Sequence, residues 1–303
     1  MGQGYASGLA GLATDFGVAV SDEQPPAPAG PWSPSQAAPS LPASSPPSSR
    51  LKKRRLISME KRLADEGHGE LLSYTRKAAV SLEKHGLGEH TARVALCLDM
   101  SASMSDLYES GQIQALAERV LALALRFDDN GEVDVFPFAT FAEEAGGMGL
   151  ADYRGRTGVL HQEADVGGST DYGEAMRLVR GRYAGSADLR SAPLLPDADA
   201  GAVEPPVFVM FVTDGATSGP EAALEHVRSS SYEPVFWQFM AIGEPDEFEF
   251  LAELSARPGP YLDNIGFFSV RDPGELTDEQ LYDLLLARYP RWLAAARGRG
   301  LTP

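Results

Sequence analysis

Three nearly uninterrupted apolar runs, separated by segments with helical periodicity, restrict the possible folds of this chain more than any other feature. The runs cover residues 93–98, 207–213 and 234–242 of the 303-residue sequence. A strand that is apolar on both sides is typical of a parallel sheet that helices cover on both faces. Because the runs alternate with helical segments, we predict an α/β fold with a doubly wound, mostly parallel sheet.

The segments around the apolar runs complete this alternation. The other predicted elements are helices at 113–127, 172–183 and 246–255, a strand at 265–270, two antiparallel edge strands at 132–138 and 140–144, and a surface loop at 186–206. Ser218 as a capping residue and Pro220 in the first turn predict the start of another helix. The final helix should be capped by Thr277 with Gln280, and Pro290 should break or kink it.

The chain divides into three parts by composition. Residues 1–50 are rich in Pro, Ser and Ala, with nine of the 22 prolines, and such a segment buries too little apolar surface to order itself. We predict a disordered tail there. Residues 51–90 carry nine basic and six acidic side chains and apolar residues at helical spacing, which predicts a basic helical preface. Residues 91–296 form the predicted α/β domain.

The composition of the chain limits the kinds of binding partner and the cellular locations that we expect for it. A formal net charge of −17 disfavours nucleic acid as a partner, because binding to phosphates needs a basic surface. The single cysteine, Cys97, excludes an internal disulfide and suits a reducing compartment. No apolar run approaches the length that spans a membrane, and the first twenty residues lack the basic start of a secretory signal. We therefore expect a cytoplasmic protein without integral membrane association.

Three turns, distant in the sequence, carry oxygen-bearing side chains where a strand ends or a helix begins. They are residues 99–103 (DMSAS), 167–171 (GGSTD) and 213–215 (TDG). In open α/β sheets, ligands bind beyond the carboxyl ends of the strands, where the strand order reverses. Hydroxyl and carboxylate oxygens from three loops suit a hard divalent cation such as Mg²⁺. The turns therefore predict a metal site at this edge of the sheet.

The order of these residues resembles the metal-ion-dependent adhesion site of von Willebrand factor A (VWA) domains, whose pattern is Asp-x-Ser-x-Ser, then a Thr, then an Asp. The matching residues are Asp99, Ser101, Ser103, Thr170 and Asp214. The resemblance implies a Rossmann-like VWA fold with Mg²⁺ or Mn²⁺ as cofactor. It also implies that the two serines and the threonine ligate the metal directly, whereas the two aspartates act mainly through water.

The same resemblance implies a function. Neutral hydroxyl ligands leave the cation much of its positive charge, so a carboxylate from an Asp or Glu of a protein partner can complete its coordination. The chain is accordingly expected to be a binding module and not an enzyme. Within the superfamily it is similar to the bacterial tellurium-resistance TerF-type branch and to copine A domains. The residues that carry this similarity are 77–84, 99–104, Leu107, Tyr108, Gly111, 127–131 and 168–172.

Other interpretations of these residues remain open at this stage. Asp99, Ser101, Thr170 or Asp171 could be ordinary helix caps, and Asp214 could belong to an ordinary turn. An Mg²⁺-dependent phosphatase or hydrolase is one functional alternative, and a purely structural component of a defence complex is another. The sequence has no phosphate-binding loop, no Gly-x-Ser-x-Gly and no His-Glu-x-x-His.

Overall fold

The computed structural model describes residues 47–128, 130–164, 168–184, 204–257 and 259–303. The disordered tail predicted for residues 1–50 lies outside the described residues up to position 46. Helix α1 begins at Pro47, so the last positions assigned to the tail belong to a helix. The surface loop predicted for residues 186–206 also lies outside the described residues, up to position 203.

The described residues contain a six-stranded sheet, which confirms the predicted α/β class. Its strands are β1 (Arg93–Asp99), β2 (Val133–Phe138), β3 (Gly147–Met148), β4 (Val207–Thr213), β5 (Val235–Ile242) and β6 (Ile265–Val270). The spatial order is β3-β2-β1-β4-β5-β6. All neighbouring strands are parallel except β3, which pairs antiparallel with β2. The strand order therefore reverses between β1 and β4, as in a doubly wound fold.

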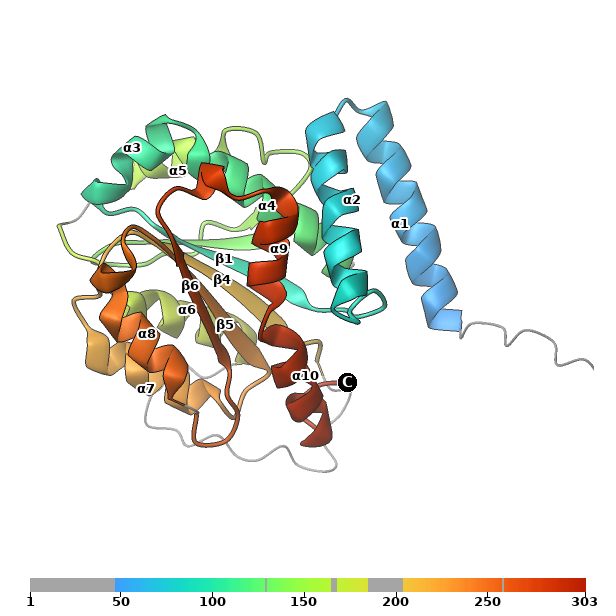
Figure 1. Cartoon of the computed structure of the whole chain (residues 1–303). Coiled ribbons are helices and arrows are strands. Elements are labelled where there is room, and N and C mark those ends of the chain that lie inside the picture. Colours follow the sequence, from blue (N-terminus) through green and yellow to red (C-terminus); the bar gives the residue numbers. More distant parts are fainter. Residues whose placement is uncertain (1–46, 129, 165–167, 185–203, 258) are drawn as a thin grey trace, which may run out of the picture. The chain divides into compact units, whose positions relative to one another are not determined.

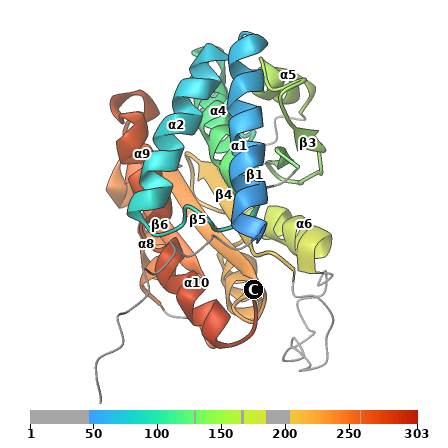
Figure 2. The same ribbon diagram turned by 90° about the vertical axis from the view of Figure 1, so that its right-hand side faces the viewer.

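Helices cover both faces of the sheet, as Figures 1 and 2 show. One face carries α2 (Gly69–Lys84), α4 (Gln112–Phe127), α9 (Asp278–Leu286) and α10 (Tyr289–Gly298), and the other carries α6 (Tyr172–Ala184), α7 (Pro220–Ser230) and α8 (Glu249–Ala256). Successive residues of a strand point to opposite faces. In β1, Leu96 and Leu98 accordingly pack in the first core, whereas Ala95 and Cys97 pack in the second.

The basic preface forms two antiparallel helices outside the first face. Helix α1 (Pro47–Asp65) lies beside α2, and α2 lies against α4 and α9 (Figure 2). Leu63 of α1 and Leu71 of α2 are fully buried in the first core. An ion pair between Arg126 and Glu60 also joins α4 to α1. These contacts make both helices part of the same packed unit as the sheet.

Several local predictions are confirmed and two are wrong. Thr277 and Gln280 form a capping box at the start of α9, and the chain breaks into α9 and α10 just before Pro290. The edge strand predicted at 140–144 is instead a single bridge between Phe138 and Ala142, and the strand proper, β3, comes later. Pro137 explains this shift, because it offers no N–H to a partner strand at that position.

The second wrong prediction concerns Ser218. Helix α7 starts with Pro220 in its first turn, but Gly219 occupies the position before it, and no side chain caps the helix. The Ser218 side chain donates instead to the carbonyl oxygen of Thr170, at 3.1 Å. The serine is therefore used to join two loops rather than to begin a helix.

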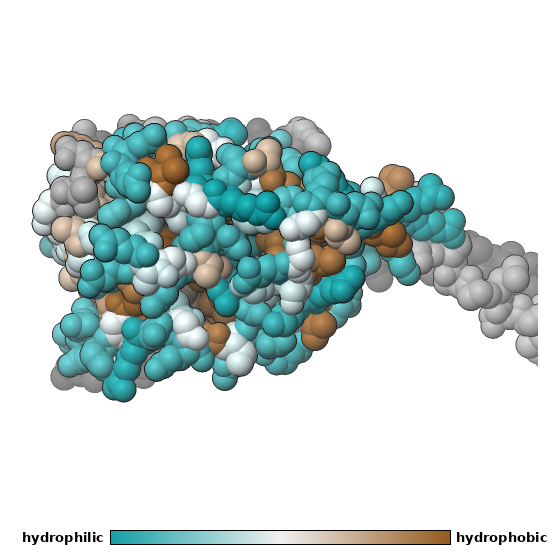
Figure 3. Space-filling view, turned by 90° about the horizontal axis from the view of Figure 1, so that it is seen from above, coloured by the Kyte–Doolittle hydropathy of each residue, from teal (hydrophilic) through white to brown (hydrophobic). Residues whose placement is uncertain are grey.

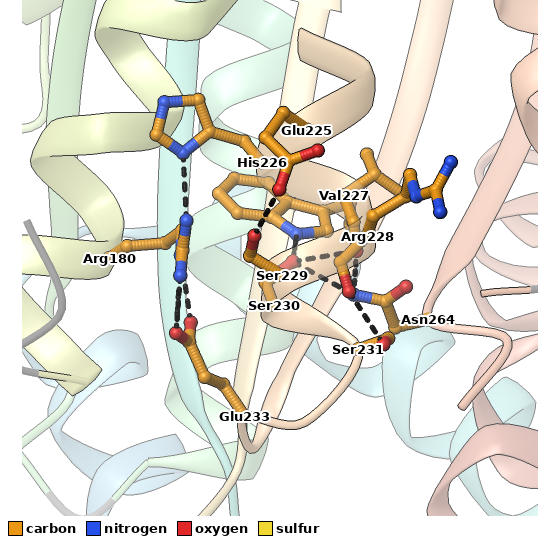
Figure 4. Close-up of polar contacts among 11 residues, drawn as sticks. Arg180, Glu225, His226, Val227, Arg228, Ser229, Ser230, Ser231, Glu233 and Asn264 are labelled. Carbon is orange, nitrogen blue, oxygen red and sulfur yellow. Dashed lines mark hydrogen bonds and ion pairs between the residues drawn. The ribbon is translucent and has the colours of Figure 1, made fainter. Parts of the chain in front are cut away.

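A buried ion pair joins helix α6 to the turn that follows α7 on the second face (Figure 4). The Arg180 guanidinium, which is fully buried, donates to both carboxylate oxygens of Glu233, the shortest contact being 2.6 Å. Its other terminal nitrogen lies 3.0 Å from Nδ1 of His226 on α7. Nearby, Trp237 Nε1 and Asn264 Nδ2 both donate to the Ser230 hydroxyl. This network fixes the helices that follow two of the three predicted site loops.

The surface seen from above in Figure 3 is mainly hydrophilic, with apolar residues in small separate groups. Large hydrophobic side chains that remain exposed in the described residues include Leu51, Ile57 and Phe141. None of the described helices is both long enough and apolar enough to cross a lipid bilayer.

Candidate metal centre

The first site loop begins where β1 ends at Asp99. The Asp99 side chain is fully buried and accepts a 2.8 Å hydrogen bond from the backbone N–H of Ser101. A short 3₁₀-helix, Ala102–Met104, follows, and Ser101 precedes it without capping it. The tight turn places the Ser101 hydroxyl 3.2 Å from that of Ser103. The Ser101 hydroxyl is therefore not used as a helix cap.

The third site loop lies directly beside the first, because β4 is the neighbour of β1. Ser103 Oγ donates to Oδ1 of Asp214 at 2.7 Å. Thr213, the last residue of β4, donates its hydroxyl to the second carboxylate oxygen of Asp99 at 2.6 Å. The two loops are thus joined by one hydrogen bond at the surface and another in the interior.

The second site loop approaches from the start of α6. The Thr170 hydroxyl lies 4.0 Å from the position that a Cβ would take at Gly215, next to Asp214. The carbonyl oxygen of Thr170 accepts from Ser218 N–H at 2.7 Å. Asp171 accepts from the N–H of Gly173 at 2.9 Å. Asp171 therefore caps α6, whereas Thr170 turns its hydroxyl toward the Asp214 loop.

Two buried tyrosines hold the main chain of these loops. Tyr108 donates to the carbonyl oxygen of Asp99 at 2.8 Å, and Tyr172 donates to the carbonyl oxygen of Gly215. Burial, together with the nearby carboxylates of Asp99 and Asp214, raises the pKa of Tyr108 well above its usual range. Burial likewise raises the pKa of Tyr172, so both phenols stay protonated as donors at neutral pH. Neither tyrosine was assigned to the site from the sequence, and Thr213 was included only in the third oxygen-bearing turn and not among the metal-binding residues.

The two carboxylates of the site have unusual electrostatics. Burial raises the pKa of Asp99, although hydrogen bonds from Ser101 and Thr213 oppose this effect. Burial also raises the pKa of Asp214, and repulsion from Asp99 adds to it, while the Ser103 hydrogen bond opposes it. Among the described ion pairs, none includes either aspartate. The site thus gathers two carboxylates that form no ion pair with a positive side chain in the described part of the chain, and negative charges in this position favour a bound cation.

The donor set fits a hard divalent cation. The five predicted residues supply three hydroxyl and two carboxylate groups, and oxygen ligands are those that Mg²⁺ and Mn²⁺ prefer. Across the described residues, no three His, Cys, Asp or Glu side chains are grouped as a metal site, so a site rich in thiolates or imidazoles finds no support there. Asp99, Ser101 and Thr170 are buried, whereas Ser103 is exposed. The centre therefore opens to solvent on the Ser103 side.

The chain resembles a curated protein and several solved structures. It is 32% identical over 232 residues to the uncharacterized protein YcbR of Bacillus subtilis (strain 168), covering 75% of this chain and 87% of that one. The mussel byssus proximal thread matrix protein 1 with a zinc-occupied MIDAS motif is 16% identical, with a TM-score of 0.43, covering 65% of this chain and 47% of that one.

A third similar protein is the ArnB paralog VWA2 from Sulfolobus acidocaldarius. It is 15% identical, with a TM-score of 0.42, and the match covers 64% of this chain and 45% of that one. The present chain thus spans less than half the length of each of these two solved structures. The family model described as the vWA found in the TerF C terminus matches residues 91–302. The chain therefore belongs to the vWA-TerF-like family, which confirms the resemblance seen in its motifs.

Proposed function

We propose that this chain is a non-enzymatic, Mg²⁺-dependent or Mn²⁺-dependent protein-binding module. Ser101, Ser103 and Thr170 would hold the cation directly, while Asp99 and Asp214 would act mainly through water. The bound cation would supply a Lewis-acidic point of attachment for a carboxylate. A partner protein would provide this carboxylate from an Asp or Glu side chain.

One observation carries this proposal more than any other. Oxygen-bearing side chains from three distant loops meet at one edge of the sheet, and among them Asp99 and Asp214 have no positive partner in any described ion pair. An unbalanced pair of one buried and one half-buried carboxylate is costly in a folded protein, because burial penalises their charged forms. A divalent cation offsets this penalty, and hydroxyl ligands leave it enough charge to attract a further carboxylate.

The surroundings of the centre also suit a protein partner. A cavity of about 370 Å³ lies beside the first site loop and is lined by Met100, Phe138 and Phe141, among other residues. The Phe141 side chain at this cavity is 77% exposed. Apolar contacts of this kind would supply much of the affinity, since a single metal-bound carboxylate contributes only part of the binding free energy of a complex.

The family description supports a proposal for the biological role of the module. Because the matching domain is described from TerF, we propose that the module serves a bacterial tellurium-resistance or related stress-response system, in the cytoplasm. The acidic remainder of the chain would repel other carboxylates and so favour a partner that is shaped to fit the centre.

Calorimetric titration with Mg²⁺ and Mn²⁺ tests the metal site. We expect saturable binding to the unaltered chain and none to the Asp99→Ala, Asp214→Ala double variant. Circular dichroism should show that the double variant keeps its fold, because both positions lie at strand ends outside the cores. A matched control is Glu221→Gln, on the surface of α7, which removes one negative charge but should leave metal affinity unchanged. If the double variant binds Mg²⁺ as tightly as the unaltered chain, the assignment of Asp99 and Asp214 to the metal site is wrong.

Partner capture tests the function of the metal. We expect the chain to capture a partner in Mg²⁺ and to lose it in EDTA, with Thr170→Ala behaving like the EDTA sample and Thr170→Ser like the unaltered chain. If the chain captures the same amount of partner with and without EDTA, the metal does not mediate binding. The alternative of a structural component of a defence complex would then be favoured. If the pure protein releases phosphate from model esters, and a variant that lacks Asp99 does not, the phosphatase alternative would instead be favoured.

A further inference from the structure

The cavity beside the first site loop, of about 370 Å³, has two walls from distant parts of the chain. One wall is the turn that follows β2, residues 137–143, which we call the Phe141 turn. The other is the end of helix α5 (Arg156–Glu163) together with Ala164. Helix α5 lies beside α3 (Ser105–Glu109), the helix that follows the first site loop (Figure 1). Most of the residues that line the cavity are apolar.

Hydrogen bonds within the Phe141 turn fix its shape. The backbone N–H of Ala139 donates to the carbonyl oxygen of Phe141 at 2.8 Å, and the N–H of Glu143 donates to the carbonyl oxygen of Pro137 at 3.1 Å. Two cross-connections in so short a turn leave it little conformational freedom. Its side chains are therefore held ready for a partner, which lowers the entropy that binding must overcome.

The Phe141 turn is also joined to two loops of the candidate metal centre. The N–H of Met100, in the first site loop, donates to the carbonyl oxygen of Phe138 at 2.7 Å. The N–H of Asp171, in the second, donates to the carbonyl oxygen of Ala139 at 2.8 Å. The cavity is therefore continuous with the loops that would hold the cation, and one bound segment can contact both.

Phe141 itself is the most exposed large hydrophobic side chain in the described part of the chain, at 77%. Aromatic side chains bury much apolar area at little cost in conformational entropy, and they are frequent anchors of protein interfaces. A small molecule inside the cavity would leave the outer side of this ring uncovered. The ring therefore fits the surface of a protein better than a free metabolite.

The charges at the cavity restrict that protein further. Glu143 and Glu163 line it and are exposed, and neither forms an ion pair with a described residue. A second copy of this chain, with its net charge of −17, would be repelled on average. A segment with Lys or Arg would instead complement the two carboxylates.

We propose that this cavity receives an apolar side chain of a partner protein, from a segment that also carries Lys or Arg. The apolar side chain packs against Phe141, and the basic side chain lies near Glu143 and Glu163. The inference rests on the proposed function, because the same segment supplies the Asp or Glu that binds the cation. Recognition thus requires an acidic, an apolar and a basic residue close together in the partner.

A phage library of random decapeptides with one fixed central Asp tests this proposal against the full chain in Mg²⁺. A second library with Asn at the fixed position is the control. We expect the Asp library to yield binders that are enriched, relative to the input, in large apolar residues and in Lys or Arg. The Asn library should yield few binders. The proposal is overturned if no binder emerges, or if the binders show neither enrichment.

Variants of the chain then locate the binding of the selected peptides, which calorimetry measures. Phe141→Ser should weaken binding at least about tenfold, as expected for an aromatic anchor. The matched control Val80→Ser removes a side chain that is 65% exposed on α2 and should bind normally. Equal binding to Phe141→Ser and to the unaltered chain would overturn the proposal.

A second pair of variants tests the charges. The Glu143→Gln, Glu163→Gln variant should weaken binding roughly threefold, as expected for exposed ion pairs, and only for peptides that keep their Lys or Arg. The control Glu275→Gln, Glu279→Gln removes the same charge from exposed positions outside the cavity. If both double variants bind these peptides equally, the basic part of the motif is wrong.

Two further measurements separate this inference from its alternatives. Binding that persists in EDTA but is lost in Phe141→Ser would support the cavity and contradict the metal-dependent function. Binding that needs Mg²⁺ but is unchanged in Phe141→Ser would do the reverse. Analytical ultracentrifugation of the unaltered chain addresses the remaining occupant. A dimer that Phe141→Ser abolishes would overturn the proposal in favour of a second copy.

Discussion

Ser103 Oγ donates a 2.7 Å hydrogen bond to Oδ1 of Asp214, although 111 residues separate the two in the chain. The bond joins the turn after β1 to the turn after β4, at the point where the strand order reverses. The pairing of β1 with β4 sets this distance, and the site oxygens therefore lie close together before any cation arrives. Such preorganisation reduces the conformational entropy that binding must overcome.

Metal binding should raise the thermal stability of the chain. A ligand that binds only the folded state at a hundred times its dissociation constant adds about 2.7 kcal/mol, which for a domain of this size shifts the melting temperature by roughly 5–10 °C. Differential scanning calorimetry with Mg²⁺ and with EDTA measures this shift. The same shift in the Asp99→Ala, Asp214→Ala variant would show that the metal stabilises the fold from another place.

The Thr213 hydroxyl should support metal binding without touching the cation. Thr213→Val keeps the shape of the side chain but removes its 2.6 Å hydrogen bond to Asp99, so a buried carboxylate oxygen loses its partner. We expect a loss of about 1–3 kcal/mol of unfolding free energy and at least a tenfold weaker affinity for Mg²⁺. The matched control is Thr157→Val, which removes a partly buried 3.0 Å hydrogen bond to Gln114 elsewhere. If both variants bind Mg²⁺ equally well, Thr213 does not position Asp99.

The buried ion pair of Arg180 and Glu233 should be costly to break from one side. Arg180→Met leaves the Glu233 carboxylate buried without its partner, and changes of this kind cost about 3–5 kcal/mol. The double variant Arg180→Met, Glu233→Leu should recover much of this loss, because no uncompensated charge remains. Urea unfolding of the single and double variants measures both effects. A single variant as stable as the unaltered chain would mean that Glu233 reaches solvent.

Two buried histidines should make the fold sensitive to mild acid. Burial, and then the positive charge of Arg180, lowers the pKa of His226 to about 4, and burial with Arg297 and Lys52 lowers the pKa of His90 to about 3. The unfolded chain binds these protons near pH 6.5, whereas the folded chain does not. Stability is therefore fully present above pH 6.5 and falls as the pH drops from 6.5 toward 4, by up to about 1.4 kcal/mol per pH unit for each histidine.

The variant His226→Gln isolates one of these contributions. Glutamine keeps an acceptor for the Arg180 guanidinium but does not titrate, so the acid side of the stability curve should become less steep. Urea unfolding at several pH values between 4 and 7 gives the two slopes. Identical slopes for the variant and the unaltered chain would show that His226 is protonated in the folded state as readily as in the unfolded state.

The amino-acid sequence by itself determined the fold class, and it predicted the five residues of the candidate metal centre, whose role as metal ligands stays a prediction. Fully apolar strands and amphipathic helices are local patterns, and parallel strands bring their carboxyl ends to one edge, so the ends at Asp99 and Thr213 were predictable neighbours. The break before Pro290 and the Thr277 cap follow from equally local chemistry. Residues within one turn of each other decide these features.

Only the tertiary structure decided which distant groups became partners. The bond from Thr213 to Asp99, the ion pair of Arg180 with Glu233, and the use of Ser218 by the Thr170 loop depend on how separate segments pack. A periodic pattern shows which side of a helix or strand is buried. It does not identify the atoms of other segments that the buried side chains contact.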